Sequence, residues 1–314
     1  MAGLVPAIHV LLAAPKTWMR GTSPRMTVEN SSRSTKHPDR FLLAGLMGWP
    51  VMHSRSPMLH NYWFRQHGLP GSYVPLAIKA DGLRAALRAL PALGFAGSNL
   101  TIPHKEAALE IVDRVDPLAR RIGAVNTIIV KPDGSLEGRN TDAFGYVESV
   151  REAQPAWRAD AGPIVVIGAG GGARAVLASL IDAGAREIRL LNRTPARAQA
   201  LARELGGPIQ ALDWSQREGA LAGAAMLVNT TSQGMVGEPP LELSLDPLSK
   251  SALVSDIVYI PRETPLLAAA RARGNPTVNG LGMLIHQARA AFHAWFGIMP
   301  TATAELRAMV EATT

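Results

Sequence analysis

The chain contains no cysteine among its 314 residues. Disulfide bonds, thiolate nucleophiles and cysteine-ligated metal or iron–sulfur centres are therefore excluded, and we expect no metal site. A chain without cysteine is compatible with a reducing cytoplasm, which is where we expect the protein to act. The sequence also lacks internal repeats and coiled-coil heptads, so it gives no support to a scaffolding role.

No strongly basic region is found outside the first 40 residues. The formal net charge is +7, but residues 1–40 hold six basic and two acidic residues, a net +4, which leaves +3 for the remainder. The remainder shows no basic patch with interleaved aromatic residues. We therefore expect no nucleic-acid partner.

Long apolar runs are also missing. Residues 3–14 are apolar, but they are interrupted by Pro6 and His9, follow no basic segment and are too short to cross a bilayer. We expect residues 1–40 to be a disordered extension; a start of translation at Met26 or later and a weak targeting peptide are the alternatives. No other run is long enough for a membrane helix, so we expect no membrane partner.

Hydrophobic residues make up 47% of the full sequence, and alternating strand and helix patterns dominate it after residue 40. This alternation predicts an α/β protein with two domains. We expect an N-terminal α/β substrate domain at 41–145 and a doubly wound, Rossmann-like nucleotide domain at 146–282. The last helices, 283–314, should pack back on the first domain. A monomer or homodimer is expected.

A glycine-rich turn follows the buried strand expected at 163–167 and precedes a helix expected from Arg174 to Ala183. It reads G-x-G-x-x-A, and its residues are Gly168, Ala169, Gly170, Gly171, Gly172 and Ala173. This strand–turn–helix context is typical of the pyrophosphate turn in dinucleotide-binding folds. The alternative is a glycine-rich loop without a ligand.

The next strand, expected at 187–191, ends in Asn192, Arg193 and Thr194, with Arg197 one turn later. NAD-binding folds usually place an acidic residue there to hold the ribose hydroxyls, whereas this tip is cationic. Two arginines are suited to bind the 2′-phosphate that distinguishes NADP(H) from NAD(H). NADP(H) is therefore the predicted cofactor. Residues 229–235, which include Thr230 and Met235, follow a further strand and should also face the cofactor.

Lys105 lies where a strand expected at 97–102 gives way to a predicted helix beginning at Pro103. The positive end of a helix dipole disfavours an ammonium group there and favours the neutral amine. A lysine that exchanges a proton is what carbonyl reduction requires beside a hydride donor. The alternative is an ordinary solvated lysine.

Polar side chains recur at the expected strand ends of this first half: Ser54, Ser56, Asn99, Thr101, Asn126 and Asp142. Ser56 is predicted to cap a helix that begins at Pro57, whereas Ser54 has no such local role. Asp142 opens a helix, where capping is its alternative role. Ligands of open α/β sheets bind at strand ends, so this set suits a small polyhydroxylated acid. Lys105 and Asp142 should form an ion pair.

Taken together, these residues resemble the shikimate dehydrogenase family over residues 41–300. The resemblance rests on motifs in the right order: Gly48 to Pro57, Asn99 to Lys105, Gly123 to Thr127, Asn140 to Asp142, Gly168 to Ala173, Asn192 to Thr194, Asn229 to Met235, Asp256 to Pro261, and Gly280 to Gln287. Trp49 and Arg55 are small departures at positions to which we assign no chemistry.

The resemblance implies NADPH-dependent, reversible reduction of 3-dehydroshikimate to shikimate, a step of aromatic amino-acid biosynthesis. It implies that Lys105 and Asp142 are the catalytic pair and that the proton comes from Lys105 or from a held water. Its implied substrate contacts are Ser54, Ser56, Asn99, Thr101, Asn126, Tyr259 and Gln287. Gly168 to Ala173 would hold the pyrophosphate, and Asn192, Arg193, Thr194 and Arg197 the 2′-phosphate. Met235 and Gly280 match positions near the nicotinamide.

Three alternatives remain. A quinate/shikimate dehydrogenase that prefers NAD is the nearest, and Arg193 and Arg197 argue against it. A methylenetetrahydrofolate dehydrogenase shares the split architecture, but Ser54 and Ser56 favour shikimate. A redox sensor that binds NADP without catalysis would not need both Lys105 and Asp142.

Overall fold

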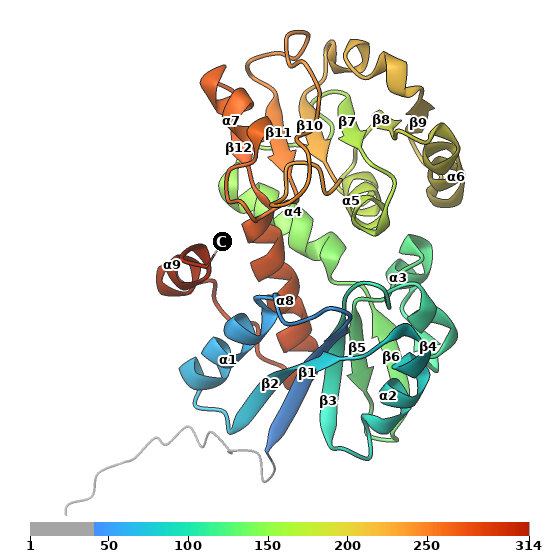
Figure 1. The fold of residues 1–314 in the computed structure, drawn as a ribbon, viewed down its shortest axis with the longest axis vertical. Coiled ribbons are helices and arrows are strands. Elements are labelled where there is room, and N and C mark those ends of the chain that lie inside the picture. Colours follow the sequence, from blue (N-terminus) through green and yellow to red (C-terminus); the bar gives the residue numbers. More distant parts are fainter. Residues whose placement is uncertain (1–40, 314) are drawn as a thin grey trace, which may run out of the picture. The chain divides into compact units, whose positions relative to one another are not determined.

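The protein is described by a computed structural model over residues 41–313 (Figure 1). The extension expected at residues 1–40 lies outside the described residues. Two six-stranded sheets organise the described chain, each flanked by helices. None of its helices combines the length and apolar character needed to cross a membrane.

The first sheet is mixed and has the order β2-β1-β3-β5-β6-β4. Its strands are β1 (Leu42–Gly48), β2 (Gly71–Ala77), β3 (Phe95–Leu100), β4 (Arg114–Val115), β5 (Thr127–Val130) and β6 (Leu136–Arg139). β1 runs parallel to β2 and β3, whereas β5 runs antiparallel to both β3 and β6. The beginning of β5 therefore lies beside the ends of β3 and β6. This arrangement places Asn126 at the start of a strand, not at the strand end that the sequence suggested.

The helices of this part are α1 (Ser56–Gln66), α2 (Leu83–Ala89), α3 (Pro117–Ile122) and α4 (Asp142–Ala153), with short 3₁₀ turns η1 (Ala80–Gly82) and η2 (Ala107–Glu110). The helix predicted from Pro103 is wrong, because Lys105 lies in a turn before η2. In a helix, the backbone N–H four residues later would donate to the carbonyl of Lys105. Here the backbone N–H of Val125 donates to that carbonyl at 2.8 Å, so the segment around Val125 replaces the helical hydrogen bond. The helix-dipole argument for Lys105 is therefore withdrawn.

The second sheet is entirely parallel and has the order β12-β11-β10-β7-β8-β9. Its strands are β7 (Ile164–Ile167), β8 (Ile188–Leu191), β9 (Ile209–Leu212), β10 (Met226–Asn229), β11 (Leu253–Asp256) and β12 (Thr277–Val278). Its helices are α5 (Gly171–Asp182), α6 (Pro195–Leu205) and α7 (Pro265–Ala272), with the 3₁₀ turns η3 (Trp214–Gln216) and η4 (Gly219–Leu221). The strand order reverses at β7, as in a doubly wound fold, which confirms the predicted class.

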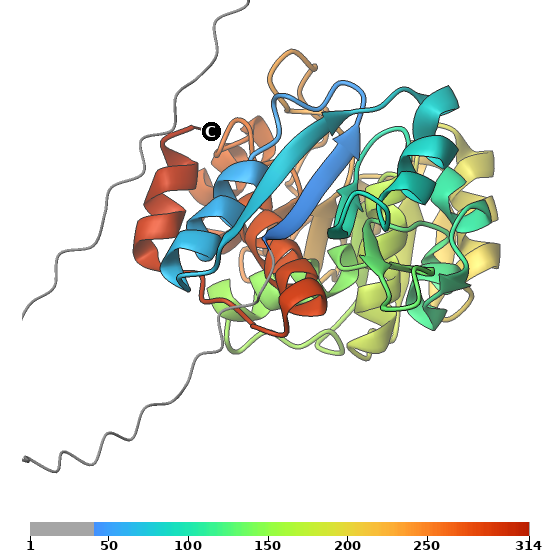
Figure 2. The ribbon, with the colours of Figure 1, turned by 90° about the horizontal axis from the view of Figure 1, so that it is seen from below.

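The last helices pack on the first sheet, as predicted. Apolar residues of α8 (Gly280–Phe296) and α9 (Ala304–Glu311) share one core with α1 and β1, including Leu59, Trp63, Ile285, Phe292 and Leu306. Figures 1 and 2 show α1, α8 and α9 gathered together. Burial of these large side chains is the main term that holds α8 there.

Helices α4 and α8 cross in close contact. A Cβ at Gly282 would lie 2.2 Å from Ser149 Oγ, and one at Gly145 would lie 2.8 Å from Gln287 Cβ. Only glycine at these two points lets the backbones approach so closely. The crossing brings Gln287 of α8 next to the helix that begins at Asp142.

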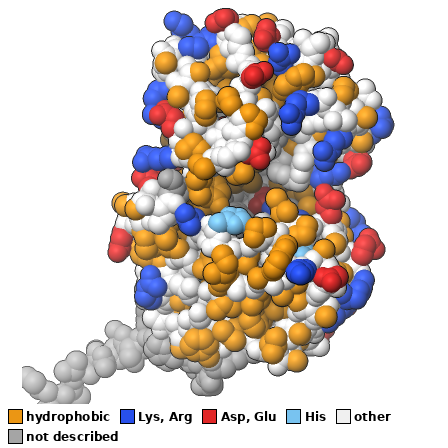
Figure 3. All heavy atoms as spheres, viewed as in Figure 1, with side chains coloured by type: hydrophobic (Ala, Val, Ile, Leu, Met, Phe, Trp, Pro, Cys, Tyr) orange, Lys and Arg blue, Asp and Glu red, His pale blue; other side chains and the backbone are white. Residues whose placement is uncertain are grey.

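Charges of both signs are interspersed over the face of the described residues that Figure 3 shows. Apolar side chains lie among them. That face therefore carries no continuous basic strip of the kind that follows a nucleic-acid backbone.

Candidate active site and cofactor pocket

The expected ion pair between Lys105 and Asp142 is present. Lys105 Nζ donates to Asp142 Oδ2 at 2.7 Å, and the side chains are 28% and 6% exposed, respectively. Asp142 is the first residue of α4, where the helix dipole stabilises a carboxylate. Its backbone N–H is satisfied by Asn140 Oδ1 at 3.0 Å, and no capping bond uses the carboxylate. The carboxylate therefore serves Lys105 and leaves the amine as the accessible member of the pair.

The two serines exchange the roles that the sequence suggested. Ser56 is the first residue of α1 and makes no capping bond, so the predicted cap is wrong. Ser54 Oγ instead accepts the backbone N–H of Ser56 at 3.2 Å and donates to Ser56 Oγ at 3.3 Å. The cause is that Arg55 already has helical dihedral angles, which draws Ser56 into the helix. Both hydroxyls stay together at the start of α1.

Asn99 has a fixed amide orientation. Its Nδ2 donates to the backbone carbonyl of Asn126 and to Thr127 Oγ1, both at 3.0 Å, while Oδ1 accepts from the Tyr73 hydroxyl at 2.8 Å. A carbonyl oxygen can only accept, so Nδ2 must face Asn126. Both N–H groups are used, and Asn99 offers a ligand a lone pair rather than a donor.

Asn126 lies behind the site and orients its neighbours. It is only 1% exposed; Oδ1 accepts from the backbone N–H of Thr141 at 2.8 Å, and Nδ2 donates to Gln287 Oε1 at 3.1 Å. No described residue accepts from Gln287 Nε2, so Gln287 presents a donor. The structure thus makes Asn126 a support for Gln287. Thr101, half-buried just after β3, likewise has no described partner for its hydroxyl.

Tyr259 lies near the serine loop. It follows β11 and packs, half-buried, against the core shared by α1 and α8. Burial raises the pKa of Tyr259, and the nearby charge of Arg55 opposes that rise. Arg55 stands between Ser54 and Ser56 and also donates to the carbonyl of Thr313. Arg55, a position to which we assign no chemistry, therefore lies close enough to Tyr259 for its charge to act on that phenol.

A cavity of about 270 Å³ adjoins the glycine-rich turn at β7. Its lining comprises Ile167, Gly168, Ala169, Gly170, Asn192, Arg193, Arg197, Trp214, Thr230, Thr231, Ser232 and Gln233. Gly168 has φ +110°, and a Cβ there would lie 2.6 Å from Thr230 Oγ1, so glycine is required. Helix α5 begins at Gly171, three residues earlier than expected. Its unpaired backbone N–H groups suit a pyrophosphate beside this turn.

Arg193 and Arg197 are exposed at the rim of this cavity. Within the described part of the chain, no carboxylate lies at ion-pair distance from either. Asn192 Nδ2 donates to the carbonyl of Thr194 at 2.9 Å, which closes the turn before α6. Two uncompensated guanidinium groups at one cavity are well suited to a phosphate dianion.

Not every residue predicted to bind the cofactor lines this cavity. Gly171, Gly172, Ala173, Thr194, Met235 and Gly280 do not. Gly280 packs on the backbone, because a Cβ there would lie 2.0 Å from Ile257 O. Trp214 lines the cavity but was missed, since the only local signal around it, the Asp213–Gln216 capping box, predicts a turn and no ligand.

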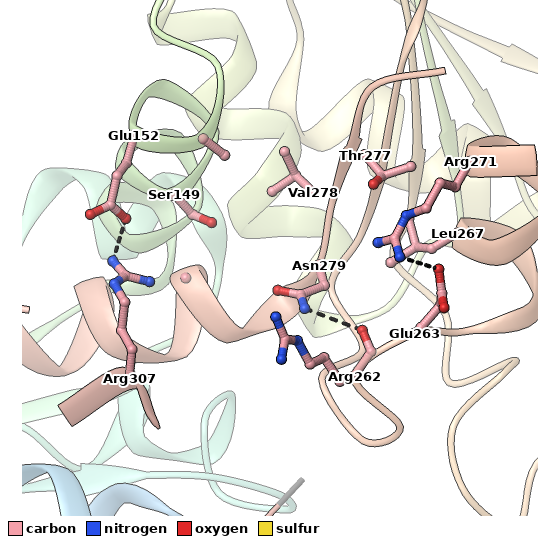
Figure 4. A pocket seen from close by; sticks show the side chains of 12 residues that line it. Ser149, Glu152, Arg262, Glu263, Leu267, Arg271, Thr277, Val278, Asn279 and Arg307 are labelled. Carbon is pink, nitrogen blue, oxygen red and sulfur yellow. Dashed lines mark hydrogen bonds and ion pairs between the residues drawn. The ribbon is translucent and has the colours of Figure 1, made fainter. Parts of the chain in front are cut away.

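A larger cavity of about 560 Å³ lies among α4, α7, α8 and α9 (Figure 4). None of the predicted site residues lines it. Two of its arginines are paired within the cavity: Arg307 with Glu152, and Arg271 with Glu263 at 2.8 Å. Its charges are therefore largely neutralised internally. No cluster of three or more metal-ligating side chains occurs among residues 41–313.

Family models match most of the described chain. They are described as "Shikimate dehydrogenase substrate binding domain" over residues 46–128, "Shikimate / quinate 5-dehydrogenase" over 152–263 and "Shikimate 5'-dehydrogenase C-terminal domain" over 280–304. The shikimate dehydrogenase (NADP(+)) of Paramagnetospirillum magneticum is 57% identical over 268 residues, 85% of this chain and 97% of the relative. That of Paracoccus denitrificans is 48% identical over 275 residues, covering 88% and 98%.

Solved structures agree on the fold but differ in cofactor. Shikimate 5-dehydrogenase from Thermus thermophilus, in complex with NADP(H) and shikimate, is 36% identical, with a TM-score of 0.78 over 87% of this chain and all of that chain. Quinate dehydrogenase from Corynebacterium glutamicum, in complex with NAD, is 33% identical, with a TM-score of 0.81 over the same shares. The relatives at 48–57% identity are NADP(+)-dependent, NADP(H) is likewise the cofactor of this chain, and the cationic rim of the cavity agrees with that.

Proposed function

We propose that this chain, which belongs to the shikimate dehydrogenase family, interconverts 3-dehydroshikimate and shikimate with NADP(H). It is an oxidoreductase of the route to chorismate and the aromatic amino acids. The observation that carries the proposal is the Lys105–Asp142 ion pair at 2.7 Å. A partly exposed ammonium held by a buried carboxylate is suited to proton exchange with a carbonyl oxygen.

The roles of the substrate residues follow from which hydrogen-bonding groups remain free. Ser56 is a hydroxyl donor for the substrate carboxylate, and Ser54 becomes a second donor when its proton turns from Ser56 Oγ to the same carboxylate. Gln287 donates through Nε2, and Asn99 accepts a ring hydroxyl through the second lone pair of Oδ1. Thr101 and Tyr259 complete the wall of the site, and Asn126 supports Gln287. The site thus offers both hydrogen-bond donors and a hydrogen-bond acceptor at fixed places. Such a set favours a ligand that carries several hydroxyl groups and a carboxylate.

Bound NADPH supplies the hydride for the carbonyl carbon. Lys105 protonates the carbonyl oxygen, directly or through one water, and Asp142 holds the ammonium in place. In the reverse direction the same amine takes the hydroxyl proton. A positioned acid–base group contributes about 10²- to 10⁴-fold to such a step.

The cofactor is held by the glycine-rich turn and the cationic tip of β8. Gly168 to Ala173 and the beginning of α5 receive the pyrophosphate. Asn192, Arg193, Thr194 and Arg197 bind the 2′-phosphate, and Thr230 borders the same cavity. Met235 and Gly280 lie toward the nicotinamide. Residues 41–145 with 283–314 form the substrate domain, and 146–282 form the nucleotide domain. A cytoplasmic monomer or homodimer completes the proposal.

Absorbance at the NADPH band tests the proposal directly. Purified protein is given shikimate or quinate with NADP or NAD, in all four pairings. Turnover with shikimate and NADP alone supports the proposal. Comparable turnover with quinate or NAD would extend the activity of the chain to that of quinate dehydrogenase from Corynebacterium glutamicum, to which it is 33% identical. No turnover in any pairing, from folded protein, would refute an enzyme and favour a sensor.

A further inference from the structure

Three helices are tied together at one buried histidine. His286 of α8 is 3% exposed, and its Nε2 lies 2.9 Å from Glu152 Oε2 in the last turn of α4. Its Nδ1 lies 2.8 Å from Arg289 Nη1, which is also on α8. Glu152 Oε2 accepts a second hydrogen bond, from Arg307 of α9 (Figure 4). The imidazole therefore connects α8 to α4 directly and to α9 through the same carboxylate.

The proton of this histidine has a defined place. Arginine can only donate hydrogen bonds, so His286 Nδ1 accepts from Arg289 and carries no proton. The single ring proton lies on Nε2 and is donated to the carboxylate of Glu152. Burial lowers the pKa of His286, against the opposing effect of Glu152, which agrees with a neutral ring. One tautomer is therefore selected, and the hydrogen bond from His286 to Glu152 has a fixed direction.

The next residue on α8 is Gln287, whose Nε2 is the free donor of the substrate site. Gln287 Oε1 accepts from Asn126 Nδ2 at 3.1 Å, and a Cβ at Gly145 of α4 would lie only 2.8 Å from Gln287 Cβ. Consecutive residues of a helix point about 100° apart around its axis. His286 and Gln287 thus hold α8 in two different directions. Two such contacts fix the rotation of α8 about its axis as well as its distance from α4.

We propose that His286, held by Glu152, is a positioning residue that sets the direction of the Gln287 amide toward the substrate. Without the hydrogen bond from His286 to Glu152, one of the two contacts is lost, and rotation of α8 moves Gln287 Nε2 away from the ligand. Lys105 and Asp142 lie outside this network, because Asp142 begins α4 whereas Glu152 lies about 15 Å further along the axis. The network therefore serves substrate affinity and not proton transfer. The inference rests on the proposed function only in the identity of the substrate.

Glu152→Ala is the test, and Glu152→Gln is the conservative variant, because an amide oxygen still accepts from His286 Nε2. Glu148→Ala is the matched control, since Glu148 lies on the same helix and pairs within it, with Arg151 at 3.2 Å. We expect Glu152→Ala to raise the KM for shikimate about fivefold, the size of effect that one hydrogen bond has. The kcat should change less than about twofold and the KM for NADP should not change. Glu152→Gln and Glu148→Ala should keep the wild-type constants.

A double-mutant cycle with Gln287→Ala shows whether the effect passes through Gln287. If it does, the effects of Glu152→Ala and Gln287→Ala on the KM for shikimate are less than additive. Additive effects, or an unchanged KM in Glu152→Ala, would overturn the proposal. An equal rise of KM in Glu152→Gln or in Glu148→Ala would also overturn it, because neither variant removes an acceptor from His286.

Hydrogen–deuterium exchange of the ligand-free protein tests the same hydrogen bond without a substrate. The backbone amides of α8 around His286 should exchange faster in Glu152→Ala than in Glu152→Gln or Glu148→Ala. Equal exchange in the three variants would overturn the proposal. Absence of wild-type turnover with shikimate would instead count against the proposed function, and the exchange experiment would then decide by itself whether Glu152 holds α8 through His286.

Discussion

His60 is an uncharged histidine sealed in the core beneath Tyr73. It lies on α1, is 0% exposed, and neither ring nitrogen has a hydrogen-bond partner among the described residues. Burial lowers its pKa from 6.5 to about 3. The change His60→Phe keeps an aromatic ring of similar shape and removes both unpaired nitrogens, which should leave the protein as stable or more stable at pH 8.

The pH dependence gives a sharper test. Between pH 6.5 and about 3 the folded protein keeps His60 neutral, whereas the unfolded chain takes up a proton there. Because the pKa is lower in the folded state, the unfolded state is favoured progressively as the pH falls through this window. Each pH unit is worth about 1.4 kcal/mol, so the loss at pH 4.5 is about 3 kcal/mol. Phenylalanine does not titrate and should escape this loss.

Urea unfolding, followed by circular dichroism at pH 8 and pH 4.5, measures the effect. The difference in unfolding free energy between His60→Phe and wild type should grow by about 3 kcal/mol at the lower pH, while all other titrations cancel. His67→Phe, at an exposed position just after α1, is the control and should show no such growth. A His60→Phe difference that is independent of pH would refute the argument that burial without a partner keeps His60 neutral.

Three further predictions concern the site. Lys105→Ala should lower kcat by about 10²-fold or more with a much smaller change in substrate KM; normal turnover with a large rise in KM, in steady-state assays, would contradict its role as proton donor. Replacing Arg193 and Arg197 together by alanine should raise the KM for NADP more than about tenfold and leave the KM for NAD nearly unchanged; an equal rise for both would remove the 2′-phosphate assignment. Trp214→Leu should weaken NADP binding, measured by calorimetry, about fivefold, because the indole contacts the nucleotide. Trp157→Leu, which lies outside this cavity, is the control and should not weaken it. Equal affinities of the two variants would show that Trp214 lines the cavity without contacting NADP.

Several features of the site were accessible from the sequence because they depend on local order. The glycine-rich turn could be predicted because strand, glycines and helix follow one another directly, and Gly168 indeed requires a positive φ. The ion pair of Lys105 with Asp142 could be predicted because both residues follow strand patterns whose ends meet at one edge of a sheet. The role of Arg193 at the cofactor site could be predicted because Arg193 directly follows a strand of the nucleotide-binding pattern.

Other features depended on neighbours distant in the chain. Lys105 lies in a turn because Val125, twenty residues later, takes its carbonyl. Asn126 enters the site at the beginning of β5 because β5 runs antiparallel to β3, which the strand pattern could not show. Trp214 reaches the cavity only because β9 pairs with β8.

The sequence alone was enough to predict the α/β class, the phosphate-binding turn and the chemical types available for catalysis. The tertiary structure alone decided which of those groups remain free. Asn99 keeps a free acceptor, Gln287 keeps a free donor and the amide of Asn126 is fully engaged, because each amide first satisfies buried partners. Local propensity acts through bonds between near neighbours. The availability of a polar group depends on every atom packed around it, and those atoms come together only in the folded chain.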